Sequence, residues 1–187
     1  MAPKIKITKD DIVAAALELV RLGGEDALNT RAIASRLGCS TQPIFSNFSS
    51  MEDLRDNVIE AAKKICGEYT EREIKSGEFP IYKASGMAYI RFAEEEKQLF
   101  KLLYMRDRGE EDTTDEDTQA SDASVSIIKN NLGLDEEAAR LFHLEIWALV
   151  HGIASMTATG FLNLDRELIS RMLTDSYQGL KNRFGKG

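Results

Sequence analysis

Apolar residues recur at intervals of three and four along most of the chain, a spacing that places them on one face of an α-helix. The first such run is Ile12, Ala15, Ala16, Leu19 and Val20. The chain contains only three prolines, and most of it lacks helix-breaking residues, so we expect an all-α protein. The pattern predicts about nine helices, over residues 9–23, 30–37, 40–47, 50–76, 81–95, 97–105, 120–131, 135–160 and 165–184.

Polar residues stand at most of the expected helix starts, where a side-chain oxygen can accept a hydrogen bond from an unpaired backbone N–H. The expected caps are Thr8, Thr30, Ser40, Ser49 or Ser50, Asp135 and Asp165. Gly38 is expected to end the second helix, because glycine readily adopts the left-handed conformation found there. The acidic stretch 107–119 is expected to be a solvated loop.

The second and third expected helices are short and are joined by a tight turn at residues 38–40. This arrangement predicts a helix-turn-helix, whose second helix enters the DNA major groove. The third segment, "STQPIFSNF" (residues 40–48), has no charge but many hydroxyl and amide groups. Because Gln and Asn can bond adenine and a Thr methyl can contact thymine, we expect this segment to read DNA sequence. Phe45 and Phe48 can anchor the helix or pack on sugars.

The segment "LNTRAIASRLGCSTQPIFSNFSSMEDL" resembles the DNA-binding region of TetR-family transcriptional repressors. The shared features are a Thr opening the second helix, Leu-Gly at the turn, two aromatics three residues apart and a Leu early in the fourth helix, here Thr30, Leu37, Gly38, Phe45, Phe48 and Leu54. The resemblance covers about residues 8–55 and implies a three-helix helix-turn-helix domain over residues 1–55. Phe45, Asn47 and Met51 stand where the family usually has Tyr, His and Lys, and the Tyr and Lys commonly contact phosphate.

The residue types and the resemblance together predict the contacts with a double-stranded DNA operator. Thr41, Gln42 and Asn47 are expected to read bases, and Thr30 and Ser40 to contact phosphate. A basic N-terminal arm is expected to follow the DNA backbone or the minor groove. The full expected set is Lys4, Lys6, Thr30, Arg31, Ser40, Thr41, Gln42, Pro43, Phe45 and Asn47.

The charge distribution is compatible with a DNA partner in spite of a net charge of −7. The first 50 residues carry six basic and five acidic side chains, which gives +1. The other 137 residues carry 18 basic and 26 acidic side chains, which gives −8. The acidic surplus therefore lies outside the predicted DNA-binding segment.

A second resemblance lies in "WALVHG", residues 147–152, which is similar to a Trp-x3-His-Gly signature of one TetR subgroup. It implies that residues 56–187 form a helical domain that binds a small-molecule effector and dimerises through its last two helices. Aromatic and Met side chains are the expected ligand contacts, with ordinary core packing as the alternative for each. The expected contacts are Met87, Tyr89, Phe92, Phe100, Leu103, Tyr104, Trp147 and His151.

The eighth expected helix is apolar nearly all round, so it must be covered on more than one side. One side can pack within its own domain and another against a second copy of the chain. With the ninth helix, it would form a four-helix interface in a homodimer. The expected interface residues are Ile153, Met156, Leu168, Met172 and Tyr177.

Other function classes receive little support. Residues 146–164 run for 19 residues without a charge, but they include His, Ser, Thr, Asn and Gly, so we expect a buried helix and no membrane partner. His143 and His151 would lie about 12 Å apart along a helix, too far to share a metal ion. The chain has no nucleophile motif or phosphate loop, so no catalytic residue, metal or cofactor is expected. Two cysteines without disulfide or metal spacing suggest a reducing cytoplasm.

The sequence therefore predicts a cytoplasmic, homodimeric, ligand-responsive transcriptional regulator that acts as a repressor on a palindromic operator. The alternative is a dimeric helical interaction module that does not bind DNA. A gel-shift measurement with genomic DNA fragments separates the two.

Overall fold

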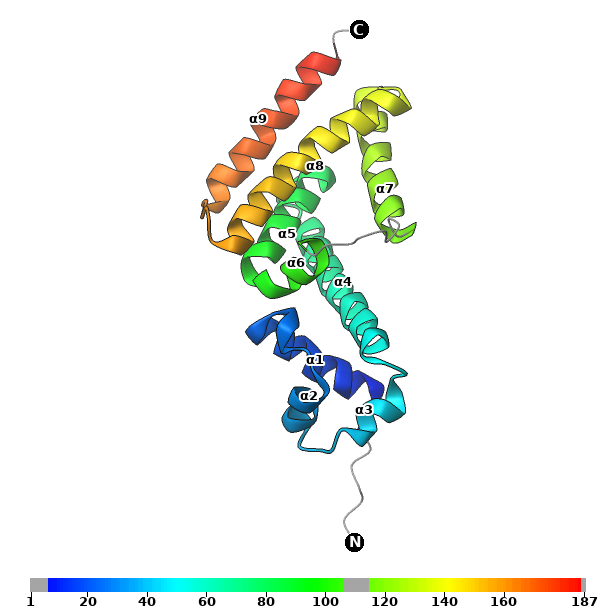
Figure 1. Cartoon of the computed structure of the whole chain (residues 1–187). Coiled ribbons are helices and arrows are strands. Elements are labelled where there is room, and N and C mark those ends of the chain that lie inside the picture. Colours follow the sequence, from blue (N-terminus) through cyan, green and yellow to red (C-terminus); the bar gives the residue numbers. More distant parts are fainter. Residues whose placement is uncertain (1–6, 106–114, 186–187) are drawn as a thin grey trace. The chain divides into compact units, whose positions relative to one another are not determined.

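The computed structural model describes residues 7–105 and 115–185, with only the backbone described over residues 115–120. These residues form helices and no β-strand, which confirms the all-α prediction (Figure 1). The helices in this part of the chain are α1 (Lys9–Gly23), the 3₁₀ helix η1 (Glu25–Ala27), α2 (Thr30–Leu37), α3 (Gln42–Asn47), α4 (Met51–Ser76), α5 (Ile81–Glu95), α6 (Lys97–Tyr104), α7 (Asp115–Leu132), α8 (Glu136–Thr159) and α9 (Arg166–Phe184).

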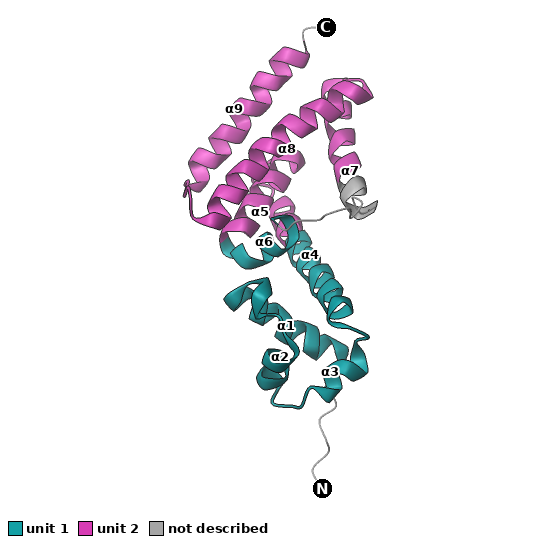
Figure 2. Ribbon diagram, in the orientation of Figure 1, with its two compact units in different colours: residues 1–68, 95–106 teal, residues 69–94, 107–187 magenta. Residues whose placement is uncertain are grey.

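The chain packs into two compact units, each with its own core (Figure 2). Unit 1 comprises residues 1–68 and 95–106, and unit 2 comprises residues 69–94 and 107–187. The chain therefore leaves unit 1 within α4 and returns to it just before α6. This division reflects packing, whereas the boundary expected between residues 55 and 56 separates functions and stays a prediction.

Unit 1 is built on α1, whose apolar face packs against α2, α3 and α6. Ile12 of α1, Ile33 of α2 and Ile44 of α3 are each at most 1% exposed. Near the end of α1, Arg21 forms a two-bond ion pair with Glu96 beside the start of α6, with N–O distances of 2.7 and 2.8 Å. Burial of these apolar faces holds the short helices α2 and α3 on a common support.

Unit 2 is organised around α8, which contacts both α7 and α9. Phe142 of α8 is fully buried, and its ring meets Tyr177 of α9 edge-on with ring centroids 5.3 Å apart. Helix α5 comes close to both helices at Gly86, where a Cβ would lie 3.3 Å from Val150 and 3.4 Å from Leu173. A side chain at residue 86 would therefore crowd the packing of α5 against α8 and α9.

Helix α8 is also the one helix among the described residues that is long and apolar enough to cross a membrane, judged by length and composition. Buried helices of folded domains have the same composition. Helix α8 packs against α7 and α9 and buries Phe142, Ile146 and Val150.

The predicted caps of α1 and α4 are present. Thr8 Oγ1 accepts the Asp11 N–H at 3.1 Å, and the Thr8 N–H donates to the Asp11 carboxylate at 2.9 Å, which completes a capping box. At α4, Ser50 Oγ accepts the Asp53 N–H at 3.0 Å. Of the two serines considered for this position, Ser50 is therefore the cap, while the Ser49 N–H donates to the Asp53 carboxylate.

The caps of α8 and α9 are also as predicted, because Asp135 and Asp165 each accept a backbone N–H at 2.8 Å. The start of α7 differs from the prediction. Residues 115–119 were expected in an acidic loop, but they belong to the helix. Acidic residues are favoured in the first turn of a helix by its dipole, so an acidic stretch does not by itself indicate a loop.

Two predicted caps are wrong. Thr30 is the first residue of α2, and the cap is Asn29, whose Oδ1 accepts the Ala32 N–H at 2.9 Å. Asparagine and threonine both cap helices well, so a pattern alone does not choose between such neighbours. Ser40 does not cap α3, which begins at Gln42. A capping side chain usually accepts from the N–H two or three residues on, and at residue 40 the second of these is a proline, which has none.

Replacing Asn29 with Ala should lower the free energy of unfolding by about 0.5–2 kcal/mol, because the Ala32 N–H loses its acceptor. Urea unfolding followed by circular dichroism measures this loss. Thr30→Ala is the matched control and should cost less, since the described structure shows no hydrogen bond from the Thr30 side chain. If Thr30→Ala lowers the free energy of unfolding more than Asn29→Ala does, then Thr30 is the cap and Asn29 is not.

Candidate DNA-binding and ligand-binding sites

Helices α2 and α3 meet at a turn whose backbone favours glycine. Gly38 has φ 64° and ψ 33°, in the left-handed region. Its N–H donates to the Ser35 carbonyl at 3.2 Å, and the Cys39 N–H donates to the Ala34 carbonyl at 3.0 Å. These bonds close α2 and redirect the chain toward α3 within a few residues. The predicted helix-turn-helix is therefore present in the structure.

Helix α3 has one buried face and one exposed face. Ile44 is 1% exposed and Phe48, which follows the helix, is 3% exposed. The Lys9 ammonium group of α1 lies 5.0 Å from the centroid of the Phe48 ring. Phe45, in contrast, is 60% exposed. Phe48 is therefore a core anchor, whereas Phe45 is presented on the surface.

The other predicted DNA contacts around α3 are wholly or partly exposed. Ser40 and Gln42 are exposed, and Thr41, Pro43 and Asn47 are half-buried. Asn47 Nδ2 donates to the Pro43 carbonyl at 2.7 Å, which leaves the Asn47 side-chain oxygen as an acceptor. The Gln42 side chain makes no hydrogen bond with a described residue, so its donor and acceptor are both available.

Helix α2 adds a cation beside this surface. Arg31 is exposed and forms no ion pair with a described residue, whereas Arg36 pairs with Glu18 of α1. Thr30 is half-buried at the start of the helix. The arm residues Lys4 and Lys6 lie outside the described residues.

Two tyrosines of α5 meet two histidines of α8 in unit 2. The Tyr82 hydroxyl lies 3.0 Å from Nδ1 of His143, and the Tyr89 hydroxyl lies 2.9 Å from Nδ1 of His151. The Trp147 ring stacks on the His151 ring, with centroids 5.0 Å apart. Burial lowers the pKa of both histidines. Three of the predicted ligand contacts, Tyr89, Trp147 and His151, are thus neighbours.

The remaining aromatic candidates lie elsewhere. Phe92 is fully buried in unit 2, where its ring meets Tyr69 edge-on with centroids 5.5 Å apart. Phe100, Leu103 and Tyr104 belong to α6 in unit 1, and the Phe100 and Tyr104 ring centroids are 5.2 Å apart. The predicted ligand contacts are therefore divided between the two units and do not form one site.

Unit 2 contains a cavity of about 660 Å³, formed by α5, the segment that joins α8 to α9, and the first turns of α9. Pockets that bind small organic molecules have about this volume. Met87 is the predicted ligand contact that lines it. The apolar part of the wall is Met87, Ile90, Leu164 and Ile169.

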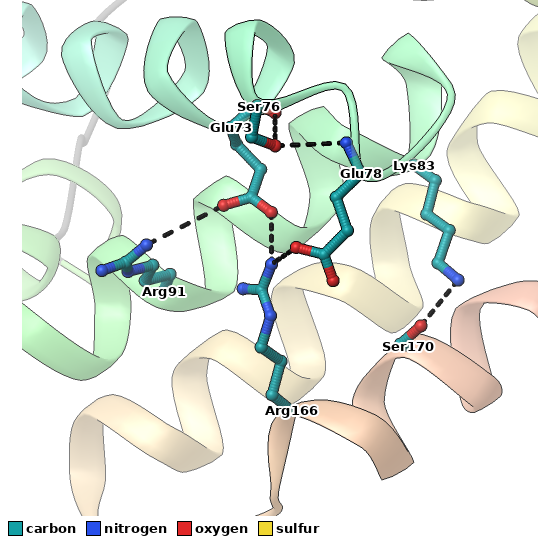
Figure 3. A network of polar contacts seen from close by, with 7 residues as sticks. All are labelled: Glu73, Ser76, Glu78, Lys83, Arg91, Arg166 and Ser170. Carbon is teal, nitrogen blue, oxygen red and sulfur yellow. Dashed lines mark hydrogen bonds and ion pairs between the residues drawn. The ribbon is translucent and has the colours of Figure 1, made fainter.

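The charged part of the wall is supported by a carboxylate at the end of α4 (Figure 3). Glu73 is 5% exposed, accepts a bond of 2.5 Å from Arg166 Nη2, and lies 4.0 Å from Arg91 Nη1. Arg166 also donates to Glu78 at 2.7 Å, and its bonds to the two carboxylates raise its pKa. The sequence predictions do not include these charged wall residues. The available signal is the presence of Arg91 and Glu94 in a largely apolar segment.

Two family models match the chain. The model for "Bacterial regulatory proteins, tetR family" matches residues 12–58. The model for "Tetracyclin repressor-like, C-terminal domain" matches residues 82–176, which is more than half of the chain. The chain belongs to the TetR family.

Relatives and solved structures agree with the TetR assignment. An uncharacterized HTH-type transcriptional regulator of Mycobacterium tuberculosis is 24% identical over 172 residues, which cover 87% of this chain and 76% of that protein. A protein of unknown function from Rhodococcus sp. RHA1 aligns over 100% of both chains, with 20% identity and a TM-score of 0.71. A TetR protein of Acinetobacter baumannii in complex with minocycline aligns over 96% of this chain and 97% of its own, with 17% identity and a TM-score of 0.60. The structural likenesses show a shared fold.

TetR-family proteins are DNA-binding, ligand-responsive transcription regulators, and such regulators are generally not enzymes. The assignment confirms the sequence prediction of a TetR-type helix-turn-helix followed by a TetR-type C-terminal domain. The comparisons do not confirm the Trp-x3-His-Gly subgroup, so that finer assignment stays a prediction.

Helix α8 of this TetR-family protein carries an exposed apolar face. Leu141, Leu144 and Trp147, each three residues apart, are 42%, 56% and 45% exposed. Ile153, one of the predicted interface residues, is 1% exposed and is part of the core of unit 2. The other predicted interface residues are half-buried, namely Met156, Leu168, Met172 and Tyr177.

The two histidines should make the stability of this TetR-family protein depend on pH. Burial lowers their folded pKa below the ordinary value of 6.5, so the unfolded chain binds protons first as the pH falls. This contribution to stability is fully present above about pH 6.5 and is lost as the pH falls through the folded pKa. Urea unfolding between about pH 7.5 and pH 5.5 measures it.

The chain has only two histidines, so single variants can apportion this pH dependence. His151→Gln should reduce the slope of stability against pH. Ser155→Ala, which removes a hydroxyl 3.3 Å from His151 Nε2, leaves the titrating ring in place and should retain a slope. The carboxyls of Asp11 and Asp53, whose pKa values are lowered by hydrogen bonds, act at more acidic pH. A slope unchanged in both His143→Gln and His151→Gln would assign the effect to other groups.

Proposed function

We propose that this protein is a cytoplasmic, homodimeric repressor that binds a palindromic DNA operator and changes its affinity for the operator when a small molecule binds. The observation that carries the proposal is the division of α3 into two faces. Ile44 and Phe48 hold the helix against α1, while Gln42 and Phe45 are presented outward. An anchored helix with an outward polar face suits the major groove.

The contacts with DNA follow from the side-chain chemistry. Gln42 has a donor and an acceptor available and is proposed to bond an adenine edge, with Thr41 beside it. The Asn47 oxygen would accept from a base or a water molecule. Arg31, Thr30, Ser40 and the arm lysines Lys4 and Lys6 are proposed to contact phosphate. Pro43 and Phe45 would pack on the sugar edge.

The exposed apolar face of α8 supports the proposed homodimer. Three large apolar side chains in a row at 42–56% exposure are unfavourable in water unless a partner covers them. A second copy of the chain offers the same face, and a two-fold axis places each residue near its own counterpart. The half-buried residues of α9 would extend this interface. A two-fold dimer requires a palindromic operator.

Regulation requires a ligand that binds one conformation better than another, because only a difference in affinity shifts the equilibrium. Unit 2 offers two places for such a ligand, the cavity of about 660 Å³ and the cluster of Tyr89, Trp147 and His151. The solved A. baumannii TetR protein holds minocycline, which supports a ligand role for this fold.

Gln42→Ala should relax sequence preference at one base pair in each half-site, at a cost of about 1–3 kcal/mol there. The measurement is selection from random double-stranded DNA, followed by titration of the selected site and its single-base variants. Asn130→Ala, an exposed amide of α7, is the matched control and should bind like the wild type.

If Gln42→Ala lowers the affinity for every DNA sequence equally, Gln42 contacts the DNA backbone rather than a base. If the wild-type protein enriches no sequence at all, the operator proposal fails. The alternative of an interaction module without DNA binding then becomes the better account.

Leu144→Glu should disrupt the homodimer, because a two-fold interface would bury two unpaired carboxylates. Sedimentation velocity at micromolar concentration should show a dimer for the wild type and a monomer for this variant. Leu22→Glu, at a leucine that is 76% exposed in unit 1, is the matched control and should remain dimeric. A monomeric wild type, or a dimeric Leu144→Glu protein, contradicts the proposed interface.

A further inference from the structure

The cavity in unit 2 has an apolar floor that is already formed. Met87 and Ile90 of α5 are 3% and 2% exposed, and Ile169 of α9 is 5% exposed. Apolar walls of this kind bind the hydrocarbon part of a ligand by excluding water. An aliphatic or aromatic body therefore suits this part of the cavity.

Two arginines and two carboxylates line the cavity, and the carboxylates of Glu73 and Glu78 lie behind the arginines. The arginines, Arg91 and Arg166, both lie against the carboxylate of Glu73, and Arg166 also bonds Glu78 (Figure 3). Their positive charge is therefore largely compensated within the protein. Glu94 and one further carboxylate also line the cavity and contribute negative charge.

The two lining carboxylates differ in their bonding. Asp165 uses Oδ1 to cap α9 through the Leu168 N–H at 2.8 Å, which leaves its other oxygen as an acceptor. Glu94 forms no hydrogen bond or ion pair with any described residue. Lys83 lies on the far side of Glu78, where its ammonium group is engaged by Ser170 at 2.7 Å (Figure 3). Even with Lys83 included, carboxylates outnumber cations around this site.

We propose that the cavity binds an amphipathic organic cation, with its hydrocarbon body against Met87, Ile90 and Ile169 and its positively charged amine between Glu94 and Asp165. An anionic ligand of the same shape would face these two carboxylates, while Arg166 is paired with Glu73 and Glu78 and Arg91 lies 4.0 Å from Glu73. As the identity of the effector, this inference rests on the proposed regulatory function, but binding itself can be measured without DNA.

Three eight-carbon probes test the charge preference, because they share a hydrocarbon chain and differ in the head group. Octylammonium is cationic at neutral pH, octanoate is anionic, and 1-octanol is neutral. Isothermal titration of the full-length protein, below the concentrations at which the probes aggregate, should give saturable binding of octylammonium. Its affinity should exceed that of octanoate at least tenfold and also exceed that of 1-octanol.

Two variants locate the binding. Glu94→Gln should weaken octylammonium binding about two- to fivefold, as expected for the loss of one exposed ion pair, and leave 1-octanol unchanged. Glu137→Gln on α8, an exposed carboxylate outside the cavity, is the matched control and should bind like the wild type. Asn163→Trp places a large ring at an exposed lining position and should block all three probes.

Equal or tighter binding of octanoate, or no saturable binding of octylammonium up to millimolar concentration, overturns the inference. Binding that survives Asn163→Trp also overturns it, because the probe then occupies another surface. These results leave the proposed function standing if the protein still selects an operator. If the wild-type protein binds octylammonium but selects no operator, the proposed function is contradicted and the proposed cavity site still stands.

Discussion

The carboxylate of Glu73 is 5% exposed, and a charge so far from water requires compensation within the protein. Arg166 is the closer partner and Arg91 the more distant one, so the last turns of α4 and α5 and the beginning of α9 meet at this carboxylate. Removing Arg166 would leave the buried Glu73 carboxylate without its closest partner, which is unfavourable because a buried charge needs compensation. The position where α9 begins and the charged wall of the cavity therefore depend on the same interaction.

The helices are predictable from the sequence because their two main determinants, apolar spacing and capping residues, are local. Apolar residues at intervals of three and four define the face that must be buried, and capping side chains mark the ends. The errors are local as well. Asn29 and Thr30 are neighbours with similar capping ability, and the acidic residues before residue 120 are as compatible with a first helical turn as with a loop. Such choices depend on where the rest of the helix packs.

The two candidate sites differ in predictability for a related reason. The helix-turn-helix lies within fewer than twenty consecutive residues, so its turn glycine and its exposed Gln42 can be inferred from spacing. Spacing alone left Phe45 and Phe48 equivalent, and only the structure shows that Phe48 is buried and Phe45 exposed. The cavity joins residues of α5 to the corner between α8 and α9, which only tertiary packing brings together. The aromatic stretch around residues 87–104 is continuous in sequence, yet it is divided between the two units because the chain crosses at residue 95. No periodicity marks that crossing.

The stacked pair of Trp147 and His151 has an optical consequence. Trp147 is the only tryptophan in the chain, so all indole emission comes from one place. Its ring is 45% exposed on the apolar face of α8 and lies against an imidazole whose hydroxyl partner is on α5. Covering that face would shift the emission to shorter wavelength, and protonating the imidazole would quench it. The natural protein thus carries an intrinsic fluorophore that distinguishes self-association from a change in the α5–α8 contact without any added label.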